Sequence, residues 1–464
     1  MNGRMRMVLM SLLIVLSVSP LVSAAEGVQP IRIDLAETTK LAVGRNLTIK
    51  ASQQNITTAT KLVEQAKGLS NVNVYATAAY YRLNSPLTLN AQTFPVDGMQ
   101  ATIPGQILAE QNVYFANLAA RYPLYNAGRI RYSITSTTYG VAEAENSAAN
   151  TQLATVLQVT RTYLAAVYGR ENVRVNQQSL KSYQEHLDQS RMSRKEGVAT
   201  DYDVIRADAA VADQTTRLTD VQNRYELALA NLRTALLLDK DTPVALQGGF
   251  FGIPSQQPVD QAEESAVQAD PLLRSIADKS CSLLMAEKSV RAEVKPQLDL
   301  VGFANILNRS SGFLTNPQWF VGLQISQLVF DGGVIRARAE ERKSQREKNN
   351  TELEGTANDV RLAVRSAYLD MDTASSAIAS SRRSVELARE SLRLAERRFK
   401  EGVGTSLEVL DANVNLLSAE TGLQQSLYQL DSAYLEAHRY LGDIVQVACS
   451  AQSDGAAYTK EGSH

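Results

Sequence analysis

The hexapeptide Lys195-Glu196-Gly197-Val198-Ala199-Thr200 returns 205 residues later as Lys400-Glu401-Gly402-Val403-Gly404-Thr405. Two further stretches repeat in the same register. Tyr125-Asn126-Ala127-Gly128 returns as Phe330-Asp331-Gly332-Gly333, and Val159, Tyr163 and Leu164 return as Val364, Tyr368 and Leu369. Three matches at one spacing indicate a duplicated structural unit. Each unit has the pattern of a strand, a long helix, a tight turn and a second helix.

The repeat divides the chain into five predicted parts. The first repeat covers 25–238, with strands over 72–83 and 113–125 and a helical hairpin over 128–238. The second covers 261–442, with strands over 297–307 and 318–330 and a hairpin over 334–441. Residues 239–260 form a Pro- and Gly-rich linker or equatorial region, and 443–464 a tail of small and polar residues. We expect a long loop over 85–112 and an N-cap at Asp201.

The long helices need partners. The segment 128–196 contains no proline, and a helix of that length would measure about 100 Å at about 1.5 Å per residue. Such a helix is stable only when other helices pack along it. Heptad spacing in the returning helices, for example Leu218, Tyr225, Leu229, Leu232 and Leu236, predicts antiparallel packing.

The first 24 residues are typical of a secretory signal peptide, because a basic start precedes an apolar stretch and the small-residue site Val22-Ser23-Ala24. The alternative, an uncleaved anchor, is disfavoured by Pro20 and the short apolar stretch. Export permits a disulfide between the only two cysteines, Cys281 and Cys449, but sequence alone leaves open whether they pair. The 47 basic and 49 acidic residues nearly balance, which gives no reason to expect a nucleic-acid partner.

The strands alternate in polarity. Tyr114, Ala116, Leu118, Ala120, Tyr122 and Leu124 share one face, and Trp319, Val321, Leu323 and Ile325 share another. Apolar faces with aromatic ends are typical of transmembrane barrel strands, although a half-buried sheet also alternates, so a single strand leaves both interpretations open. Four strands are too few to close a barrel, which needs about eight. Two copies of the chain would supply eight strands and three copies twelve.

Together these features resemble the TolC-like family of outer-membrane efflux proteins, over essentially all of the mature chain. The resemblance lies in the strand-to-helix junction 123–129, the hairpin tips 196–198 and 401–412, and the two-fold repeat. It implies an α+β membrane protein and a homotrimer in the outer membrane of a diderm bacterium. A twelve-stranded β-barrel would continue into a long antiparallel α-helical coiled-coil barrel in the periplasm. It also implies a periplasmic adaptor and an inner-membrane pump as partners, and passive conduction of the substrate.

Three groups of site residues follow. By the resemblance, the tips contact the adaptor: Gly197, Val198, Ala199, Thr200, Gly402, Val403, Gly404 and Thr405. The strand-to-helix junctions depend on Pro123, Gly128 and Gly333. Glu408 and Asp411, with Asp203 at the position of Glu408 in the first repeat, are the predicted pore constriction, because rings of carboxylates select cations. The alternatives are a simple turn at the tips and, for the acids, an ordinary helix start that favours negative charge.

One departure from the family concerns the gate. The positions where closed family tunnels carry an arginine and a tyrosine near the tip hold Gly404 and Phe399. We therefore expect a gate that closes differently. An exported coiled-coil scaffold or adhesin without a pore is the rival interpretation, since it explains the helices but not the alternating strands. The sequence carries no phosphate-binding loop or nucleophile elbow, so we expect neither an enzyme nor a cofactor, and three dispersed histidines predict no metal site. Substrate, adaptor and pump are not identified by the sequence, and a protein-secretion duct shares the same pattern.

Overall fold

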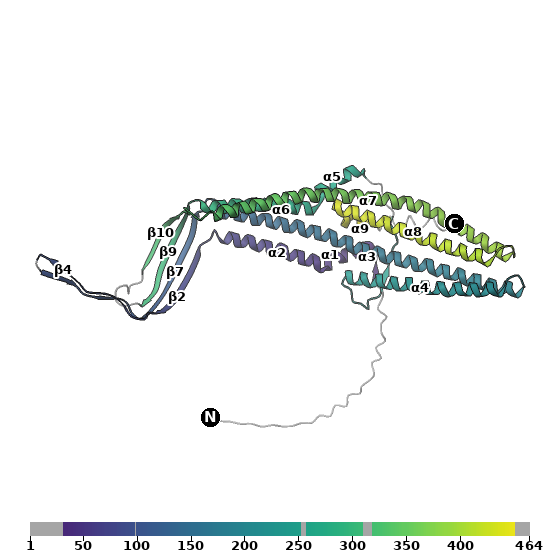
Figure 1. Ribbon diagram of the computed structural model, residues 1–464, viewed down its shortest axis with the longest axis horizontal. Coiled ribbons are helices and arrows are strands. Elements are labelled where there is room, and N and C mark those ends of the chain that lie inside the picture. Colours follow the sequence, from purple (N-terminus) through teal and green to yellow (C-terminus); the bar gives the residue numbers. More distant parts are fainter. Residues whose placement is uncertain (1–30, 98, 252–256, 310–317, 451–464) are drawn as a thin grey trace, which may run out of the picture.

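The computed structural model describes residues 31–97, 99–251, 257–309 and 318–450. The predicted signal peptide 1–24 and the end of the tail, 451–464, lie outside these ranges. The described chain is elongated, with a sheet at one end and long helices that run to two hairpin tips at the other (Figure 1). Within the described ranges, no helix is both long and apolar enough to span a bilayer.

Two helices run the full length of the helical part. These are α3 (Arg129–Lys195) and α7 (Val334–Lys400), each of 67 residues. Shorter helices pack beside them. Along α3 lie α1 (Leu35–Arg45), α2 (Leu47–Gly68) and α4 (Asp201–Ala235), along α7 lie α5 (Val259–Ala269) and α8 (Ser406–Leu441), and α6 (Pro271–Arg291) packs against both long helices. The 3-10 turn η1 (Ala292–Val294) follows α6, and α9 (Ile444–Ser450) closes the described chain. Each long helix is therefore accompanied along its length by shorter helices, as the helix lengths require.

A four-stranded antiparallel sheet joins the two repeats. Its order is β10 (Trp319–Ser326), β9 (Gln297–Arg309), β7 (Asn112–Tyr125) and β2 (Asn73–Arg82). The prediction that the last strand extends to residue 330 is wrong by four residues. Ser326 pairs with Gln297, the first residue of β9, and Pro296 before it has no N–H to extend the ladder.

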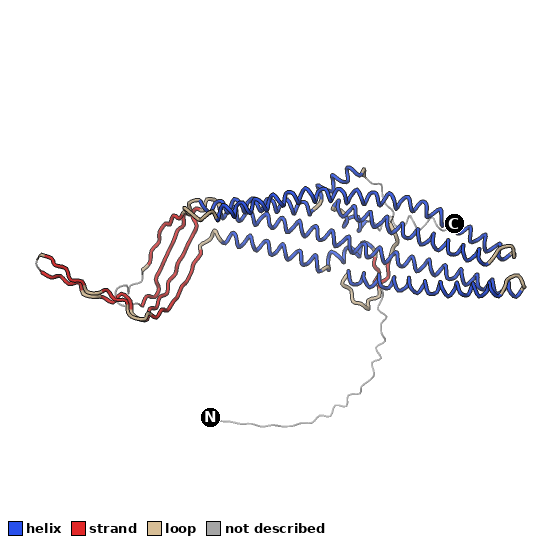
Figure 2. Tube along the Cα trace, in the orientation of Figure 1, coloured by secondary structure: helices blue, strands red, loops and turns tan. Residues whose placement is uncertain are grey.

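The predicted loop over 85–112 is instead a ribbon of short strands, so that expectation is wrong. β3 (Leu87–Leu89) pairs with β6 (Gln106–Ala109), and β4 (Gln92–Val96) pairs with β5 (Met99–Ile103). The ribbon extends beyond the far end of the sheet (Figure 2). Alternation over 92–96 and 99–103 puts Phe94, Ala101 and Ile103 on one face, while the hydroxyls of Thr93 and Thr102 lie 3.1 Å apart on the other.

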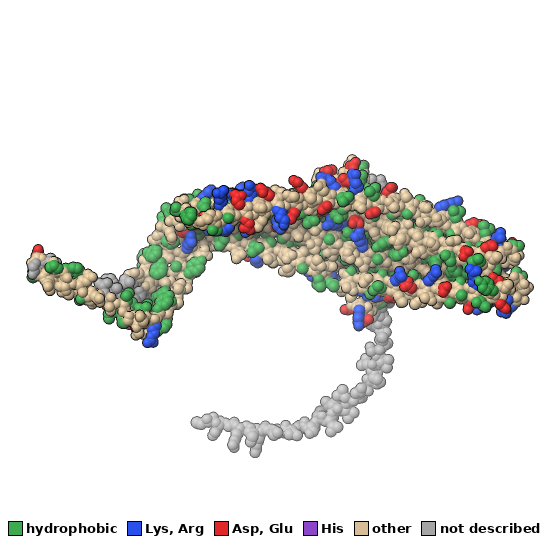
Figure 3. All heavy atoms as spheres, in the orientation of Figure 1, with side chains coloured by type: hydrophobic (Ala, Val, Ile, Leu, Met, Phe, Trp, Pro, Cys, Tyr) green, Lys and Arg blue, Asp and Glu red, His purple; other side chains and the backbone are tan. Residues whose placement is uncertain are grey.

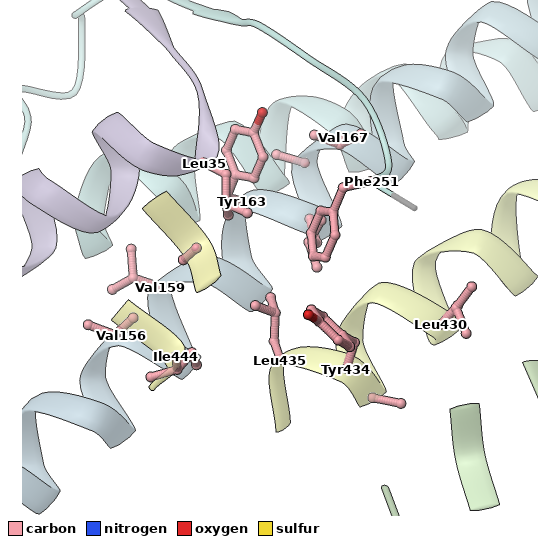
Figure 4. Packing of buried hydrophobic residues seen from close by; sticks show 14 of the residues in the cluster. Leu35, Val156, Val159, Tyr163, Val167, Phe251, Leu430, Tyr434, Leu435 and Ile444 are labelled. Atoms are coloured by element: carbon pink, nitrogen blue, oxygen red, sulfur yellow. The ribbon is translucent and has the colours of Figure 1, made fainter. Parts of the chain in front are cut away.

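The main core lies midway along the helices. Tyr163 and Leu164 of α3 pack there with Leu435 of α8 and Ile444 of α9, and all four are nearly or fully buried (Figure 4). Here β1 (Ile31–Ile33) pairs in parallel with β8 (Val244–Leu246), a contact that the sequence did not predict. The C-terminal ends of both hairpins, at Leu236 and Ala437, lie in this core, so it couples the two repeats.

Side chains of this core hold the linker by its main chain. The Tyr163 hydroxyl donates to the Gln247 carbonyl, and the Arg170 guanidinium donates to the Leu246 and Gly248 carbonyls at 3.0 and 2.7 Å. The Asp431 carboxyl accepts from the Phe251 N–H at 2.9 Å. Burial raises the pKa of Tyr163 and that of Asp431. The linker is thus fixed through backbone groups from Leu246 to Phe251.

Both cysteines are free thiols in this structure. Cys281 lies half-buried on α6 and Cys449 is exposed on α9. The two cysteines therefore do not form a disulfide bond in this structure. Among the described residues, no group of His, Cys, Asp or Glu side chains is arranged to hold a metal ion.

Candidate functional site

The register sorts the sheet side chains into two faces with different chemistry. One face is apolar across all four strands, and it includes Val74, Tyr80, Tyr114, Leu118, Tyr122, Leu298, Leu300, Trp319, Val321, Leu323 and Ile325. These residues are not covered by the chain: Trp319 and Ile325 are 76% and 75% exposed. In Figure 3 charged side chains gather on the helical part, whereas hydrophobic side chains cover much of the strand region. Tyrosines and the single tryptophan lie toward the ends of the apolar face, as in a membrane-facing sheet.

The opposite face of the sheet mixes polar with apolar side chains. It carries Asn117, Arg121, Asp299 and Gln324. The Arg121 guanidinium pairs with the Asp299 carboxylate, which is only 3% exposed. A charge pair of this kind belongs on a water-facing side rather than in contact with lipid tails.

The strand-to-helix junctions repeat one capping arrangement. Gly128 and Gly333 take left-handed backbone angles, with φ of 83° and 88°, and each is the N-cap of a long helix. The side chain preceding each by two residues closes the turn. Asn126 accepts from the Ile130 N–H at 3.2 Å, and Asp331 accepts from the Ile335 N–H at 2.7 Å. Pro123 lies in β7 just before its junction. The capping by Asn126 and Asp331 was not predicted, although both residues belong to the repeated tetrapeptide.

At the second junction, backbone N–H groups donate hydrogen bonds to the carboxylate of Asp331 and change its pKa. Asp331 also accepts from the Gly333 N–H at 2.9 Å. The N–H groups of Ile335 and Gly333 lower the pKa of Asp331, because they favour the charged carboxylate. The turn is therefore closed by an ionised cap at neutral pH.

Both hairpin tips end their helices with a left-handed glycine. Gly197 has φ of 79° and Gly402 has φ of 76°. Thr200, not the predicted Asp201, is the N-cap of α4, because its hydroxyl accepts from the Asp203 N–H and the Asp203 carboxylate accepts from the Thr200 N–H. Thr405 caps α8 in the same way through the Glu408 N–H. A threonine with an acid three residues later is a capping box, a signal that the sequence contains.

The two tips touch each other and present an apolar surface. A Cβ atom on Gly402 would lie 3.3 Å from the Val198 Cγ1. Val198 and Val403 are 58% and 67% exposed. Three further exposed apolar side chains, which the sequence reasoning missed, flank them: Tyr202, Ile205 and Leu407. Their exposure could have been suspected, since apolar residues in the first turn after a tip have no helix beyond them to pack against.

The predicted constriction acids differ in their surroundings. The Asp203 carboxylate accepts from the Thr200 N–H and hydroxyl at 2.9 and 2.7 Å, so it serves as a capping group. Glu408 lies 3.3 Å from the Arg398 Nε and close to the Thr405 hydroxyl. Asp411 is exposed one turn further along α8. The helix-start role therefore applies to Asp203 and Glu408.

The departure at the tip has a physical cause. A Cβ atom on Gly404 would lie 2.8 Å from the Arg398 Cβ and 3.0 Å from the Phe399 backbone N, closer than packed atoms come. No side chain fits at this position without moving the turn. Phe399 is buried, and its ring lies 5.0 Å from the ring of His186 on α3. It belongs to the contact between the two hairpins.

His186 of α3 contacts both α7 and α8 at the tip. Its Nε2 lies 2.8 Å from the Ser406 hydroxyl at the start of α8. Burial lowers the pKa of His186 to about 4, while the negative charge of Asp203 acts in the opposite direction. The imidazole is therefore neutral at physiological pH. Sequence reasoning treated the three histidines only as possible metal ligands and missed this role.

Comparison with known proteins agrees with this geometry. The sequence model of the outer membrane efflux protein family matches residues 39–236 and 264–443, both halves of the duplication. The chain belongs to the outer membrane efflux protein family. This chain is 25% identical over 368 residues to the probable efflux pump outer membrane protein TtgC of Pseudomonas putida, covering 76% of this chain and 75% of that protein. Nodulation protein T of Rhizobium leguminosarum bv. viciae is 24% identical, covering 70% of this chain and 68% of that protein.

Solved structures share the fold. The outer-membrane channel OprN superposes with a TM-score of 0.72 at 19% identity, covering 88% of this chain and 89% of OprN. The CmeC channel of Campylobacter jejuni superposes with a TM-score of 0.71 at 16% identity, covering 92% of this chain and 88% of CmeC. The α+β fold class and the resemblance that the sequence indicated are confirmed. The chain is an outer-membrane efflux channel protein, and the scaffold interpretation is not favoured.

Proposed function

We propose that three copies of this chain form one channel, the passive exit duct of a tripartite efflux or secretion system. The open sheet carries the proposal. Among the described residues, its outer strands β2 and β10 each pair on one side only, and one face is mainly apolar and largely exposed. Backbone edges are not tolerated in lipid, so copies must pair edge to edge until the sheet closes. Eight strands leave an interior that side chains fill, whereas twelve leave a lumen for substrates.

The partners follow from the opposite end of the chain. The exposed valines Val198 and Val403 lie at touching tips, about the full length of a 67-residue helix from the sheet. Exposed apolar groups at such a tip are typical of a protein interaction site. The occupant we propose is the helical hairpin of a periplasmic adaptor, which connects the duct to an inner-membrane pump. The relative TtgC, whose name places it in an efflux pump, supports this assignment. A passive duct needs neither a catalytic residue nor a cofactor.

The constriction is proposed at Glu408 and Asp411. In a trimer they would form two rings of three carboxylates, and such rings attract cations and resist wide opening. Asp203 contributes negative charge nearby, although its carboxylate is also a helix cap. The Arg398 guanidinium beside Glu408 partly neutralises the negative charge of the Glu408 ring. The Asp411 ring therefore carries the larger part of the cation selectivity.

The first experiment measures the conductance of the detergent-purified protein in planar bilayers, with its mass by native mass spectrometry. We expect a complex of three chains and a cation-selective pore of low conductance. Glu408→Gln with Asp411→Asn removes the charge and keeps the shape, and should reduce cation selectivity. Glu386→Gln, an exposed acid of α7 paired with Arg383, is the control. A monomer without conductance that leaves membranes in alkaline carbonate would refute the duct.

A second experiment tests the adaptor contact. Val198→Glu with Val403→Glu places charge on the tip surface and should abolish efflux in cells while native mass spectrometry of the purified protein still gives a complex of three chains. Leu227→Glu is the matched control, because Leu227 is 62% exposed on α4 away from the tip. Normal efflux by the tip variant would exclude these valines from the contact.

A further inference from the structure

A row of aromatic residues crosses the polar face of the sheet. Tyr75 of β2 pairs with Ala119 of β7, Ala119 with Phe303 of β9, and Phe303 with Phe320 of β10. Directly paired residues of antiparallel strands share a face, so these four side chains lie in one line across all four strands. The register is regular from Asn117 to Pro123, and no bulge interrupts the row.

Apart from Val301, the two neighbouring rows on this face carry polar or small side chains. Toward the helices the row contains Asn73, Arg121, Val301 and Gly322. Away from the helices it contains Thr77, Asn117 and Asn305. The two adjacent rows therefore carry no ring. A second aromatic pair, Tyr81 and Phe115, lies on the same face further from the helices, with ring centroids 5.6 Å apart, and the Thr77 row separates it from Tyr75. Exposed rings gathered in this way mark an interaction site more often than a packing need.

The rings are not covered within the chain. Tyr75 is 62% exposed and Phe320 55% exposed. Phe303 and Phe320 stack on each other, with ring centroids 5.7 Å apart and an interplanar angle of 19°. Tyr75 stands on the other side of Ala119, so the row consists of a stacked pair, a gap and a single ring.

The gap has the dimensions of an intercalation slot. Neighbouring strands lie about 4.8 Å apart, so β2 and β9, on either side of β7, lie about 10 Å apart. A flat ring between two others needs about 7–8 Å, two contacts of about 3.5–4.0 Å each. The Ala119 methyl forms the floor and leaves the space open. The strand separation exceeds this requirement, and rotation of the exposed Tyr75 side chain brings its ring into contact with the bound ring.

We infer that Tyr75, Ala119 and Phe303 form a binding slot for planar aromatic solutes on the wall of the exit path. The inference rests on the proposed trimeric channel, because that assembly turns this face toward the lumen. Three copies give three slots, each extended by Phe320. Arg121, in the adjacent row and 54% exposed by its side chain, favours an anionic substituent on the ring, although Asp299 neutralises part of its charge. Stacking between rings recognises the flat face, so a saturated ring of the same charge binds more weakly.

The test measures binding of naphthalene-2-sulfonate to the purified full-length protein in amphipol, by saturation-transfer NMR. Cyclohexanesulfonate is the saturated comparison. We expect the wild type to prefer the aromatic probe, and Tyr75→Ser with Phe303→Ser to weaken that binding about tenfold. Ala119→Phe keeps both rings but fills the slot, and should weaken it similarly. Tyr80→Ser, an aromatic residue of β2 on the apolar face, should leave binding unchanged.

Equal binding by the wild type and both slot variants, or by the two probes, would overturn the slot. Loss of binding in the Tyr80 variant as well would also overturn it, since the probe would then occupy the lipid-facing side. Planar-bilayer conductance of the same preparations separates this inference from the channel itself. A conducting trimer without aromatic preference refutes only the slot, whereas a protein that does not conduct refutes the channel and the exit path with it.

Discussion

Replacing His186 by glutamine should remove an acid-sensitive contact between the two hairpins. His186 links α3 to Ser406 at the start of α8 and lies against Phe399 of α7. Glutamine is neutral at every pH and can still bond the Ser406 hydroxyl. The variant therefore isolates the effect of protonating the imidazole.

The magnitude follows from the two pKa values. A solvent-exposed histidine has a pKa of about 6.5. In the packed tip the pKa of His186 is lowered to about 4, because burial disfavours the charged ring. A lowered folded pKa means that the stabilisation is complete above pH 6.5 and is lost as the pH falls toward 4. At pH 5 the wild type has lost about 2 kcal/mol, and the full loss below pH 4 is about 3 kcal/mol.

Two other acidic groups near His186 also influence how the stability of the tip depends on pH. Asp203 on α4 favours protonation of His186 and moderates the effect. Glu396 on α7 has a raised pKa, caused first by burial and then by Glu185 on α3. A raised carboxyl pKa adds stability as the pH falls, opposite in sign to His186. Both groups remain in the glutamine variant, so the difference between the two proteins reports His186 alone.

Hydrogen exchange of the amides in the first turns of α8 is the assay, at pH 7.5 and pH 5 with intrinsic rates corrected. The wild type should lose about 30-fold in protection relative to His186→Gln over this interval, the equivalent of about 2 kcal/mol. Wild-type and variant tips with the same pH dependence would refute the reasoning, because the ring would then not titrate in the contact.

Three further predictions concern the tip turn, a buried carboxyl group and the main core. Gly404→Ala should destabilise the tip by about 1–3 kcal/mol through the crowding described above, whereas Gly422→Ala, with nothing within 4 Å of the added Cβ, should not; exchange at the tip measures both. Asp431→Asn should match the wild type in thermal unfolding at pH 4 and exceed it at pH 8, because the raised folded pKa of Asp431 makes the wild type lose stability as the pH rises. Leu435→Ala, at a fully buried site, should cost about 2–5 kcal/mol in unfolding, while the same change at the 68% exposed Leu362 should cost less than about 0.5 kcal/mol.

The long elements were predictable because their signals are long. α7 begins at Val334 and α8 ends at Leu441, where the second predicted hairpin begins and ends, and α3 spans Arg129–Lys195, within a residue of the expected 128–196 at each end. A helix without proline that ends at a glycine is marked at both its body and its end. Because the pattern repeats 205 residues later, the helices predicted in one repeat support those predicted in the other.

The missed elements are short or depend on distant contacts. β1 and β8 have three residues each and pair across more than 200 residues, so no local periodicity marks them. The ribbon over 87–109 was hidden by a Pro- and Gly-rich composition that is also typical of loops. At the site, the tip sequence predicts the turns, but the contact of His186 with Phe399 and Ser406 joins three helices. The aromatic row likewise appears only when the register of four strands is known.

The hold on the linker has an evolutionary consequence. Tyr163 and Arg170 contact backbone carbonyls, which every residue type offers, and Asp431 contacts an N–H group, which every residue type except proline offers. Apart from Gly248, whose φ of 84° favours glycine, side chains between Leu246 and Phe251 can therefore vary among homologues at little cost, while the three residues that hold the linker should change rarely and together. In an alignment, we expect a variable linker opposite three nearly constant columns on α3 and α8.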